Sequence, residues 1–222
     1  MIVEPHRIVV GLTGLPRSGK DTVADYLVQE YGFTKFAFAD ALYEEVAEAF
    51  GVTVEQLRSV EWKTVDQDAL GVHNCKDAGF CVVFTEQANG KHFLYKATSR
   101  RILQWWGTEY RRDTCGKDYW LRRAGERIAA EISPHRIVFS DVRYDNEAAY
   151  CYAYGVGVGA ERIALLAVER DSAMRSDHTS DDALSPYILT GIIGNNHTKE
   201  DLYNVADHYM ESLTIEKREA AQ

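Results

Sequence analysis

The feature that most constrains the fold is a glycine-rich loop between an apolar segment and a helical pattern near the start of the chain. Residues 7–13 (RIVVGLT) form a β-branched apolar run, and residues 14–21 read GLPRSGKD. From residue 20 to residue 31 apolar side chains recur every three or four positions, and Gly32 follows where a glycine would end the helix. This order predicts a buried strand, a tight turn and an amphipathic helix, which is the opening unit of an α/β fold.

The loop fits the GxxxxGK pattern, and the strand before it and the helix after it supply the context in which that pattern binds phosphate. Backbone N–H groups of residues 17–22 would point into a concave nest at a helix N-terminus, where unpaired amides favour an anion. Lys20 would bridge the β- and γ-phosphates of ATP. The alternative is a glycine-rich turn with an exposed lysine. The residues that we expect to bind ATP in this loop are Gly14, Ser18, Gly19, Lys20, Asp21 and Thr22.

One position of the loop departs from the usual pattern and bears on the metal. Asp21 stands where Ser or Thr normally follows the lysine, and Thr22 comes one place later. Because the usual hydroxyl ligates Mg²⁺, we expect the metal to be held by the Asp21 carboxylate, by Thr22 or through water. Asp141, at the tip of an apolar strand, stands where a second carboxylate belongs. Its alternative role is to cap the helix that begins near Asn146.

Strands alternate with helices along most of the remaining chain. The pattern predicts further strands over residues 34–38, 136–143, 162–170 and 188–193, and helices over residues 40–50, 99–112, 119–132, 146–154 and 199–213. This alternation predicts one domain over residues 1–222, with a parallel sheet between two helical layers. Residues 62–97 differ, because they are polar and then give FCVVF, Asn89-Gly90 and HFLYK. They predict an inserted lobe with a β-hairpin.

Composition excludes several classes of function. Hydrophobic residues make up 45% and charged residues 27% of the chain, which excludes disordered and collagen-like proteins. The net charge of −9 argues against nucleic acid as a partner, because phosphate-backbone binding needs a basic face. The sequence has no apolar run of about 18 residues and no signal-peptide pattern, so we expect a cytoplasmic protein without membrane contact. The four irregularly spaced cysteines predict free thiols.

Several blocks of the sequence together resemble the phage deoxynucleoside monophosphate kinases. The blocks are GLPRSGKDT, FAFADAL, SRRILQWWGTEYRRD with YWLRR, SDVRYDNEA, RSDHTSDDAL and IIGNNHTKEDL, and they lie within residues 11–206. The aspartate after the loop lysine agrees with this family. The resemblance does not cover residues 62–96, and Asp181 stands where the family pattern leads us to expect glutamate.

The resemblance implies a P-loop NTPase fold and transfer of the γ-phosphoryl group of Mg²⁺-bound ATP to a (d)NMP in the cytoplasm, that of the host cell if the chain is phage-encoded. We expect Arg17 and Lys20 to stabilise the moving charge. We expect Arg101, Arg111 and Arg143 to hold the acceptor phosphate, and Asp141 to orient that phosphate or the metal. Arg170 and Arg175 follow the strand over residues 162–170, where a lid would approach ATP, and Asn195 and Asn196 resemble the adenine-contacting loop of related kinases. The residues that we expect to bind the acceptor are Asp40, Arg101, Gln104, Trp105, Thr108, Arg111, Trp120, Arg143 and Glu147.

The residue types support these assignments independently. Arginine forks hold phosphate oxygens in two directions, glutamine offers a donor and an acceptor to a base edge, and an indole offers a stacking face. Each arginine could instead form a surface salt bridge, and each tryptophan, Trp120 included, could be a core residue. Asn195 could belong to a turn before a helix capped by Thr198.

Two other functions fit the loop. The first is a kinase of the same fold for another phosphorylated small molecule, such as dephospho-coenzyme A or phosphomevalonate. The second is a nucleotide-binding regulator without transfer activity, although no NKxD or DxxG motif of a GTPase switch is present. The sequence leaves a homodimer open.

Overall fold

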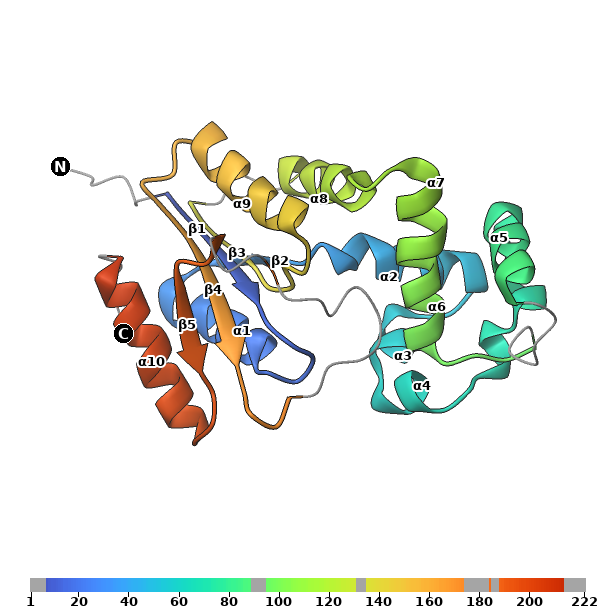
Figure 1. Ribbon diagram of the computed structural model, residues 1–222, viewed down its shortest axis with the longest axis horizontal. Coiled ribbons are helices and arrows are strands. Elements are labelled where there is room, and N and C mark those ends of the chain that lie inside the picture. Colours follow the sequence, from blue (N-terminus) through green and yellow to red (C-terminus); the bar gives the residue numbers. More distant parts are fainter. Residues whose placement is uncertain (1–6, 89–94, 131–134, 174–183, 185–187, 214–222) are drawn as a thin grey trace. The chain divides into compact units, whose positions relative to one another are not determined.

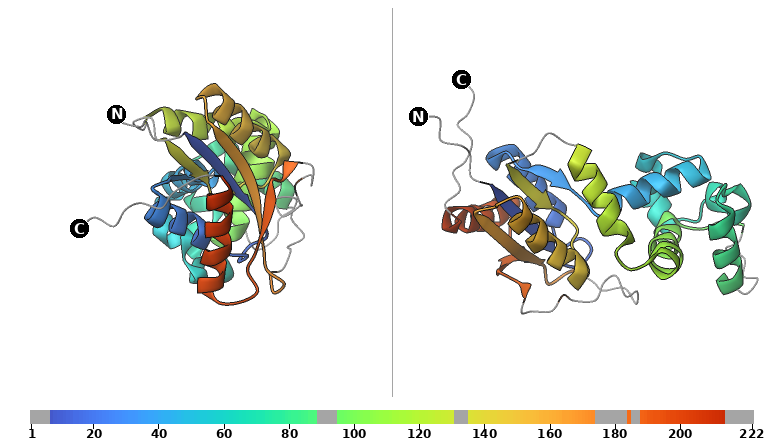
Figure 2. Two further views of the ribbon diagram at one scale, coloured as in Figure 1. Left: turned by 90° about the vertical axis from the view of Figure 1, so that its left-hand side faces the viewer. Right: turned by 90° about the horizontal axis from the view of Figure 1, so that it is seen from above.

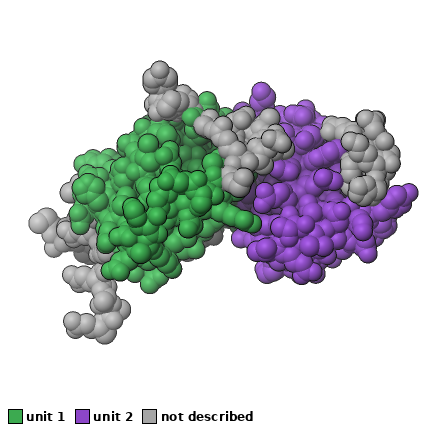
Figure 3. All heavy atoms as spheres, turned by 60° about the horizontal axis from the view of Figure 1, so that its bottom comes forward, with its two compact units in different colours: residues 1–38, 125–222 green, residues 39–124 purple. Residues whose placement is uncertain are grey.

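The computed structural model describes residues 7–88, 95–130, 135–173, 184 and 188–213 of the chain (Figures 1 and 2). The chain divides into two compact units, coloured separately in Figure 3. Unit 1 comprises Met1–Phe38 and Gly125–Gln222, and unit 2 comprises Ala39–Ala124. No helix in the described ranges is both long enough and apolar enough to cross a membrane.

Unit 1 is built on a five-stranded sheet in the order β2-β3-β1-β4-β5, and every pairing in it is parallel. Its strands are β1 (Ile8–Thr13), β2 (Thr34–Phe36), β3 (Arg136–Phe139), β4 (Arg162–Glu169) and β5 (Gly191–Gly194). The central strand β1 is buried along its whole length, as expected for a parallel strand covered on both faces.

Helices cover both faces of this sheet. Successive side chains of β1 point to opposite faces, so β1 packs against helices on each side. Ile8, Val10 and Leu12 belong to one core cluster with α1 (Lys20–Tyr31) and α10 (Lys199–Ser212). On the other face, α9 (Asp145–Gly157) packs over β1 and β4 (Figure 1). Unit 1 is therefore a three-layer α/β/α sandwich with the glycine-rich loop between its first strand and first helix. This is the P-loop NTPase fold that the sequence predicts.

The ends of the helices follow from local chemistry. Gly32, with φ of 71°, takes the left-handed conformation that closes α1, and its N–H donates to the Leu27 carbonyl. Thr198 begins α10 in a reciprocal capping box with Asp201. Both ends lie within a residue of the predicted boundaries.

Unit 2 is helical in its described residues. Its elements are α2 (Ala39–Phe50), α3 (Val54–Arg58), α4 (Val60–Thr64), the short 3₁₀ turns Asp68–Leu70 and Val72–Asn74, α5 (Ala78–Ala88), α6 (Ser99–Trp105), the π-helix η4 (Trp106–Arg112), α7 (Asp113–Cys115) and the first part of α8 (Tyr119–Ala130). Its core is strongly aromatic: Phe80 lies 4.7 Å from Trp106 and 5.3 Å from Phe84 between ring centroids. Residues 62–97 form only part of this unit.

The predicted β-hairpin is wrong. FCVVF lies inside α5, where Phe80 and Phe84 are one helical turn apart and both fully buried. The Asp77 carboxylate accepts a hydrogen bond from the Phe80 N–H at the start of this helix. A short apolar run does not by itself distinguish a strand from a buried helix, and here the aromatic core selected the helix. Most of HFLYK, the second predicted strand, lies outside the described residues.

The packing of α9 on the sheet predicts opposite behaviour for two of its glycines. A Cβ atom at Gly155 would lie 2.6 Å from Ile163 Cδ1, whereas one at Gly157 would meet nothing within 4 Å. We expect Gly155→Ala to lower the free energy of unfolding by about 1–2 kcal/mol. Gly157→Ala should leave it unchanged or raise it by up to about 1 kcal/mol. Urea denaturation measures both, and equal effects would contradict close packing of α9.

Candidate functional site

The loop between β1 and α1 has a backbone that few residues can adopt. Gly14 has φ of 137°, Arg17 of 65° and Gly19 of 108°. At Gly14 a Cβ atom would lie 2.2 Å from the Val168 carbonyl oxygen, so only glycine fits without moving β4. Arg17 is the only non-glycine residue with positive φ in the described chain. Backbone in this region is typical of functional loops that the surrounding structure holds in place.

Two polar side chains of the loop are buried. The Lys20 ammonium donates to the carbonyl oxygens of Gly14 at 2.7 Å and Leu15 at 2.9 Å, which draws the lysine back across the loop. The Ser18 hydroxyl is buried and has no hydrogen-bond partner among the described residues. A buried hydroxyl without a partner is costly, and a ligand oxygen would satisfy it.

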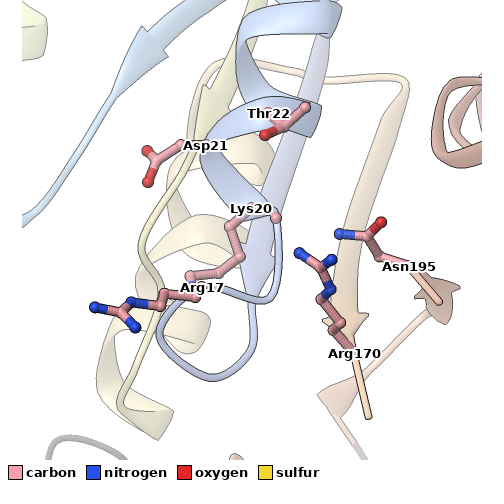
Figure 4. Close-up of a pocket in the computed structure, with 7 residues that line it drawn as sticks. Arg17, Lys20, Asp21, Thr22, Arg170 and Asn195 are labelled. Atoms are coloured by element: carbon pink, nitrogen blue, oxygen red, sulfur yellow. The ribbon is translucent and has the colours of Figure 1, made fainter. Parts of the chain in front are cut away.

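A cavity of about 230 Å³ lies at the N-terminus of α1 (Figure 4). Its lining residues are Arg17, Gly19, Lys20, Asp21, Thr22, Arg170 and Asn195. Three of these side chains are cationic and one is anionic, so the cavity is electropositive even though the whole chain is acidic. In Figure 4 Arg170 and Asn195 reach toward the loop from the opposite side, while Arg17 extends away from them. The cavity is smaller than pockets that enclose a whole drug-sized ligand, and its charge suits a polyphosphate.

Asp21 and Thr22, the predicted metal ligands, both line this cavity. Asp21 is 82% exposed and forms an ion pair of 3.1 Å with Lys35, which also contacts Asp25 at 3.0 Å. Burial opposes protonation of Lys35, but the two carboxylates outweigh it and raise the pKa of its ammonium. No group of three or more His, Cys, Asp or Glu side chains in the described chain is arranged to hold a metal ion. A cation here would therefore need ligand oxygens from bound phosphate as well.

Two of the residues predicted to lie at the donor nucleotide follow the ends of strands. Arg170 follows β4 directly and is exposed, and Asn195 follows β5 and is 9% exposed. The Asn195 side-chain amide donates to the Ser18 carbonyl oxygen at 2.7 Å. Both residues line the cavity, and their contact with the donor nucleotide stays a prediction. Arg175, the third donor-side residue, lies outside the described residues.

Asp141 does not cap α9. Its carboxylate accepts a hydrogen bond of 2.8 Å from the Phe38 N–H, and the N-cap position of α9 belongs to Tyr144. The Glu147 carboxylate accepts from the N–H groups of Arg143 and Tyr144, and this glutamate is only 4% exposed. The structure thus gives Glu147 a helix-capping role rather than an open binding face. The Arg143 side chain is exposed.

In unit 2, Arg111 lies in a cluster that sequence reasoning missed. Its Nε donates to Glu45 Oε2 at 2.8 Å, and its Nη2 lies 3.5 Å from Asp77 Oδ2. The guanidinium also lies over the ring of Tyr110, 4.4 Å from the centroid. Burial lowers the pKa of Arg111, but the hydrogen bond and charge of Glu45 outweigh it and raise that pKa. The guanidinium is thus charged and held in one orientation.

Glu45 is the acceptor at the centre of this cluster. Its carboxylate also accepts from the Trp106 indole N–H at 3.0 Å and from the Tyr119 hydroxyl at 2.5 Å. Burial and this hydrogen bond raise the pKa of Tyr119 to about 12. No motif in the sequence indicates Glu45, because it is one of several glutamates on an amphipathic helix.

The other residues predicted to bind the acceptor have different environments in unit 2. Arg101 is exposed near the start of α6, and Gln104, Trp105 and Thr108 are partly exposed. Asp40 forms a 2.6 Å ion pair with Arg58. Trp120 is only 5% exposed and its indole N–H donates to the Gly107 carbonyl, so it is a core residue, the alternative that the sequence left open, and its implied role at the acceptor is not supported.

The family comparison and the comparison with curated proteins name the same kind of protein. A family model described as "Deoxynucleotide monophosphate kinase" matches residues 8–77. The "Deoxynucleoside-5'-monophosphate kinase" of Escherichia phage T5 is 28% identical, over 93% of this chain and 98% of the phage protein. The "Putative deoxynucleotide monophosphate kinase" of Acanthamoeba polyphaga mimivirus is 27% identical, over 89% of this chain and 93% of its own. The solved structure of TT1252 from Thermus thermophilus is 16% identical, covers 94% of this chain and 99% of its own, and has a TM-score of 0.44.

The cluster around Glu45 predicts a large stability effect. Glu45→Ala removes the acceptor of Arg111, Trp106 and Tyr119, which leaves partly buried donors unpaired. We expect the free energy of unfolding to fall by about 2–4 kcal/mol. Glu48→Ala, an exposed position on the same helix, is the control and should change it by less than about 0.5 kcal/mol. Similar values for the two variants, measured by thermal and urea unfolding, would show that the cluster is not structural.

Proposed function

The chain belongs to the deoxynucleoside monophosphate kinase family, and we propose that its glycine-rich loop holds the ATP whose γ-phosphoryl group it transfers to a deoxynucleoside monophosphate. The products are ADP and a deoxynucleoside diphosphate. One observation carries the proposal: an electropositive cavity at the N-terminus of α1, lined by Lys20, Arg17 and Arg170. Neither alternative weighed from the sequence, another small-molecule kinase or a regulator, is favoured by the named relatives.

The donor triphosphate would occupy the cavity of the loop. Catalysis of phosphoryl transfer is mostly alignment and neutralisation of charge, because the transferred group spreads negative charge over its equatorial oxygens. The Lys20 ammonium donates to two carbonyl oxygens of the loop and lines the cavity, so phosphate oxygens could share or replace those acceptors. The buried Ser18 hydroxyl supplies a further donor. Arg17 and Arg170 add charge from two sides.

The same cavity fits magnesium as the partner of ATP. Mg²⁺ is usually bound by one or two protein oxygens together with substrate phosphates and water. The Asp21 carboxylate and the Thr22 hydroxyl are the protein oxygens that would hold it, since both line the cavity. When bound, the ion would neutralise phosphate charge during transfer.

For the acceptor we propose Arg101, Arg111 and Arg143 as phosphate-binding residues, with Asp141 orienting that phosphate or the metal. Arg111 is the best prepared of the three, because Glu45 and the ring of Tyr110 fix its guanidinium before substrate binds. A fixed guanidinium loses less side-chain entropy on binding than a free one. Gln104, Trp105, Thr108 and Asp40 complete the proposed acceptor set. The phage relative supports a site of action in the cytoplasm of a host cell.

A coupled assay with Mg²⁺ and ATP tests the proposal directly. Each of dAMP, dGMP, dCMP, dTMP and hydroxymethyl-dCMP is offered as acceptor, with dephospho-coenzyme A and phosphomevalonate as competing candidates. Turnover of at least one deoxynucleotide is expected. Turnover of none, with ATP binding retained, would favour the regulator instead.

Loss of the loop lysine should affect chemistry far more than folding. We expect Lys20→Ala to lower kcat by about a hundredfold or more, because its ammonium stabilises charge on the transferring group. Circular dichroism should show an intact fold. Lys117→Ala, a change at an exposed lysine in unit 2, is the control and should keep full activity. An insoluble Lys20 variant would show that the lysine is needed for folding instead.

Gln104 should influence the choice of base. Its side-chain amide offers a donor and an acceptor to a base edge. We expect Gln104→Ala to change the ratio of kcat/KM among the deoxynucleotides by about tenfold, since a hydrogen-bonded base edge is worth roughly 1–2 kcal/mol. An equal loss for every base would contradict this role.

A further inference from the structure

Asn195 connects the end of the sheet to the phosphate-binding loop. Its side-chain Nδ2 donates to the Ser18 carbonyl oxygen across 2.7 Å, in a buried hydrogen bond between residues 177 positions apart. Because a carbonyl oxygen can only accept, the amide nitrogen and not its oxygen must face Ser18. The contact therefore has one orientation.

Asn195 is itself held firmly. It follows β5, and its backbone N–H donates to the Glu169 carbonyl oxygen at 2.8 Å, which fastens it to the end of β4. Its neighbour Asn196 accepts a hydrogen bond from the Asp171 N–H. The side chain of Asn195 thus projects to the loop from a base anchored in the sheet, and it is only 9% exposed.

The hydrogen bond at the Ser18 carbonyl determines where the next amide points. In a trans peptide the C=O and the following N–H point in opposite directions, so holding the Ser18 oxygen also fixes the Gly19 N–H. No cis peptide bond occurs in the described chain, and within it the Gly19 N–H has no acceptor. This N–H is at the N-terminus of α1, where anion-binding amides are expected.

Asn195 also packs directly on Gly19. A Cβ atom at Gly19 would lie 2.4 Å from Asn195 Nδ2, so the amide occupies the space that a side chain would take. Gly19 has φ of 108°, a conformation that is unfavourable for other residues and needs support from its surroundings. The packing of Asn195 on Gly19 and its hydrogen bond to Ser18 therefore act on the same peptide unit, the one that joins these two residues.

We propose that Asn195 is a positioning residue that presets the phosphate-binding loop, so that its effect is on the polyphosphate and not on the adenine base. The inference rests on the proposed function for its biological meaning. It differs from the family resemblance, which assigns this segment to contact with adenine. The geometry supports contact with the loop, because the Asn195 amide nitrogen already donates to the Ser18 carbonyl oxygen and packs against Gly19.

Inorganic tripolyphosphate separates the two roles, since it contains the phosphate chain of ATP without the base. Isothermal titration calorimetry measures Mg²⁺-tripolyphosphate and Mg²⁺-ATP binding to the full chain. The variants are Asn195→Ala and Asn195→Leu, the second of which keeps the volume of the side chain while it removes the donor. Asn204→Ala and Asn204→Leu, at an exposed position on α10, are the matched controls. Circular dichroism verifies the fold of each variant.

If Asn195 is a positioning residue, both ligands should bind about 10- to 100-fold more weakly to both Asn195 variants. The factor should be the same for tripolyphosphate and ATP, because the unpaired Ser18 carbonyl disturbs the loop whether or not the ligand carries a base. The Asn204 variants should bind both ligands as the unsubstituted chain does. A loss confined to ATP would show an adenine contact and overturn the proposal. Unchanged tripolyphosphate binding, or none by the unsubstituted chain, would also overturn it.

Failure of the proposed kinase function has a different signature. If no deoxynucleotide is turned over while the Asn195 variants still lose tripolyphosphate and ATP equally, the positioning role holds and the reaction assignment is wrong. If turnover is present and tripolyphosphate binding does not depend on Asn195, the reaction holds and the positioning role is wrong.

Discussion

The proposed phosphate site depends on one constraint: amides that precede the first turn of α1, such as the Gly19 N–H, must stay available to an anion. An isolated chain would satisfy them with water or collapse the loop. Here glycines with positive φ at positions 14 and 19 permit the turn, the Lys20 ammonium crosses it, and the Asn195 amide holds one of its carbonyls. The sheet supplies the fixed base from which these contacts are made. The site is thus a consequence of strand ends meeting at one edge of a parallel sheet.

In unit 2 a partly exposed arginine is held in one orientation against aromatic rings. Glu45 neutralises Arg111, and the surrounding indole and phenol donors satisfy the remaining capacity of the carboxylate. Such a cluster loses stability when either partner is removed, yet it holds the guanidinium in one orientation. A guanidinium can donate to two oxygens of one phosphate at once, and a fixed orientation favours this mode of recognition. Stability and the proposed binding role therefore share the same residues.

Much of unit 1 could be predicted from local sequence, because its signals are strong and independent. The strand, loop and helix at the start, the glycine after α1 and the capping box of α10 each rest on neighbouring residues alone. The hairpin failed because FCVVF is too short for periodicity to separate strand from helix, and burial of Phe80 and Phe84 decided the matter. Glu147 and Trp120 were predicted to bind the acceptor, but capping and core packing use them instead.

The sequence by itself determined the glycine-rich loop, the parallel α/β architecture and the kind of chemistry, because their signals come from residues close along the chain. Only the tertiary structure decided that Asn195 meets Ser18, that Asp141 holds the Phe38 amide and that Glu45 fixes Arg111. Those partners lie tens to more than a hundred positions apart, and no local pattern records them. The physical reason is that a buried polar group takes whichever partner the folded chain brings within hydrogen-bond reach.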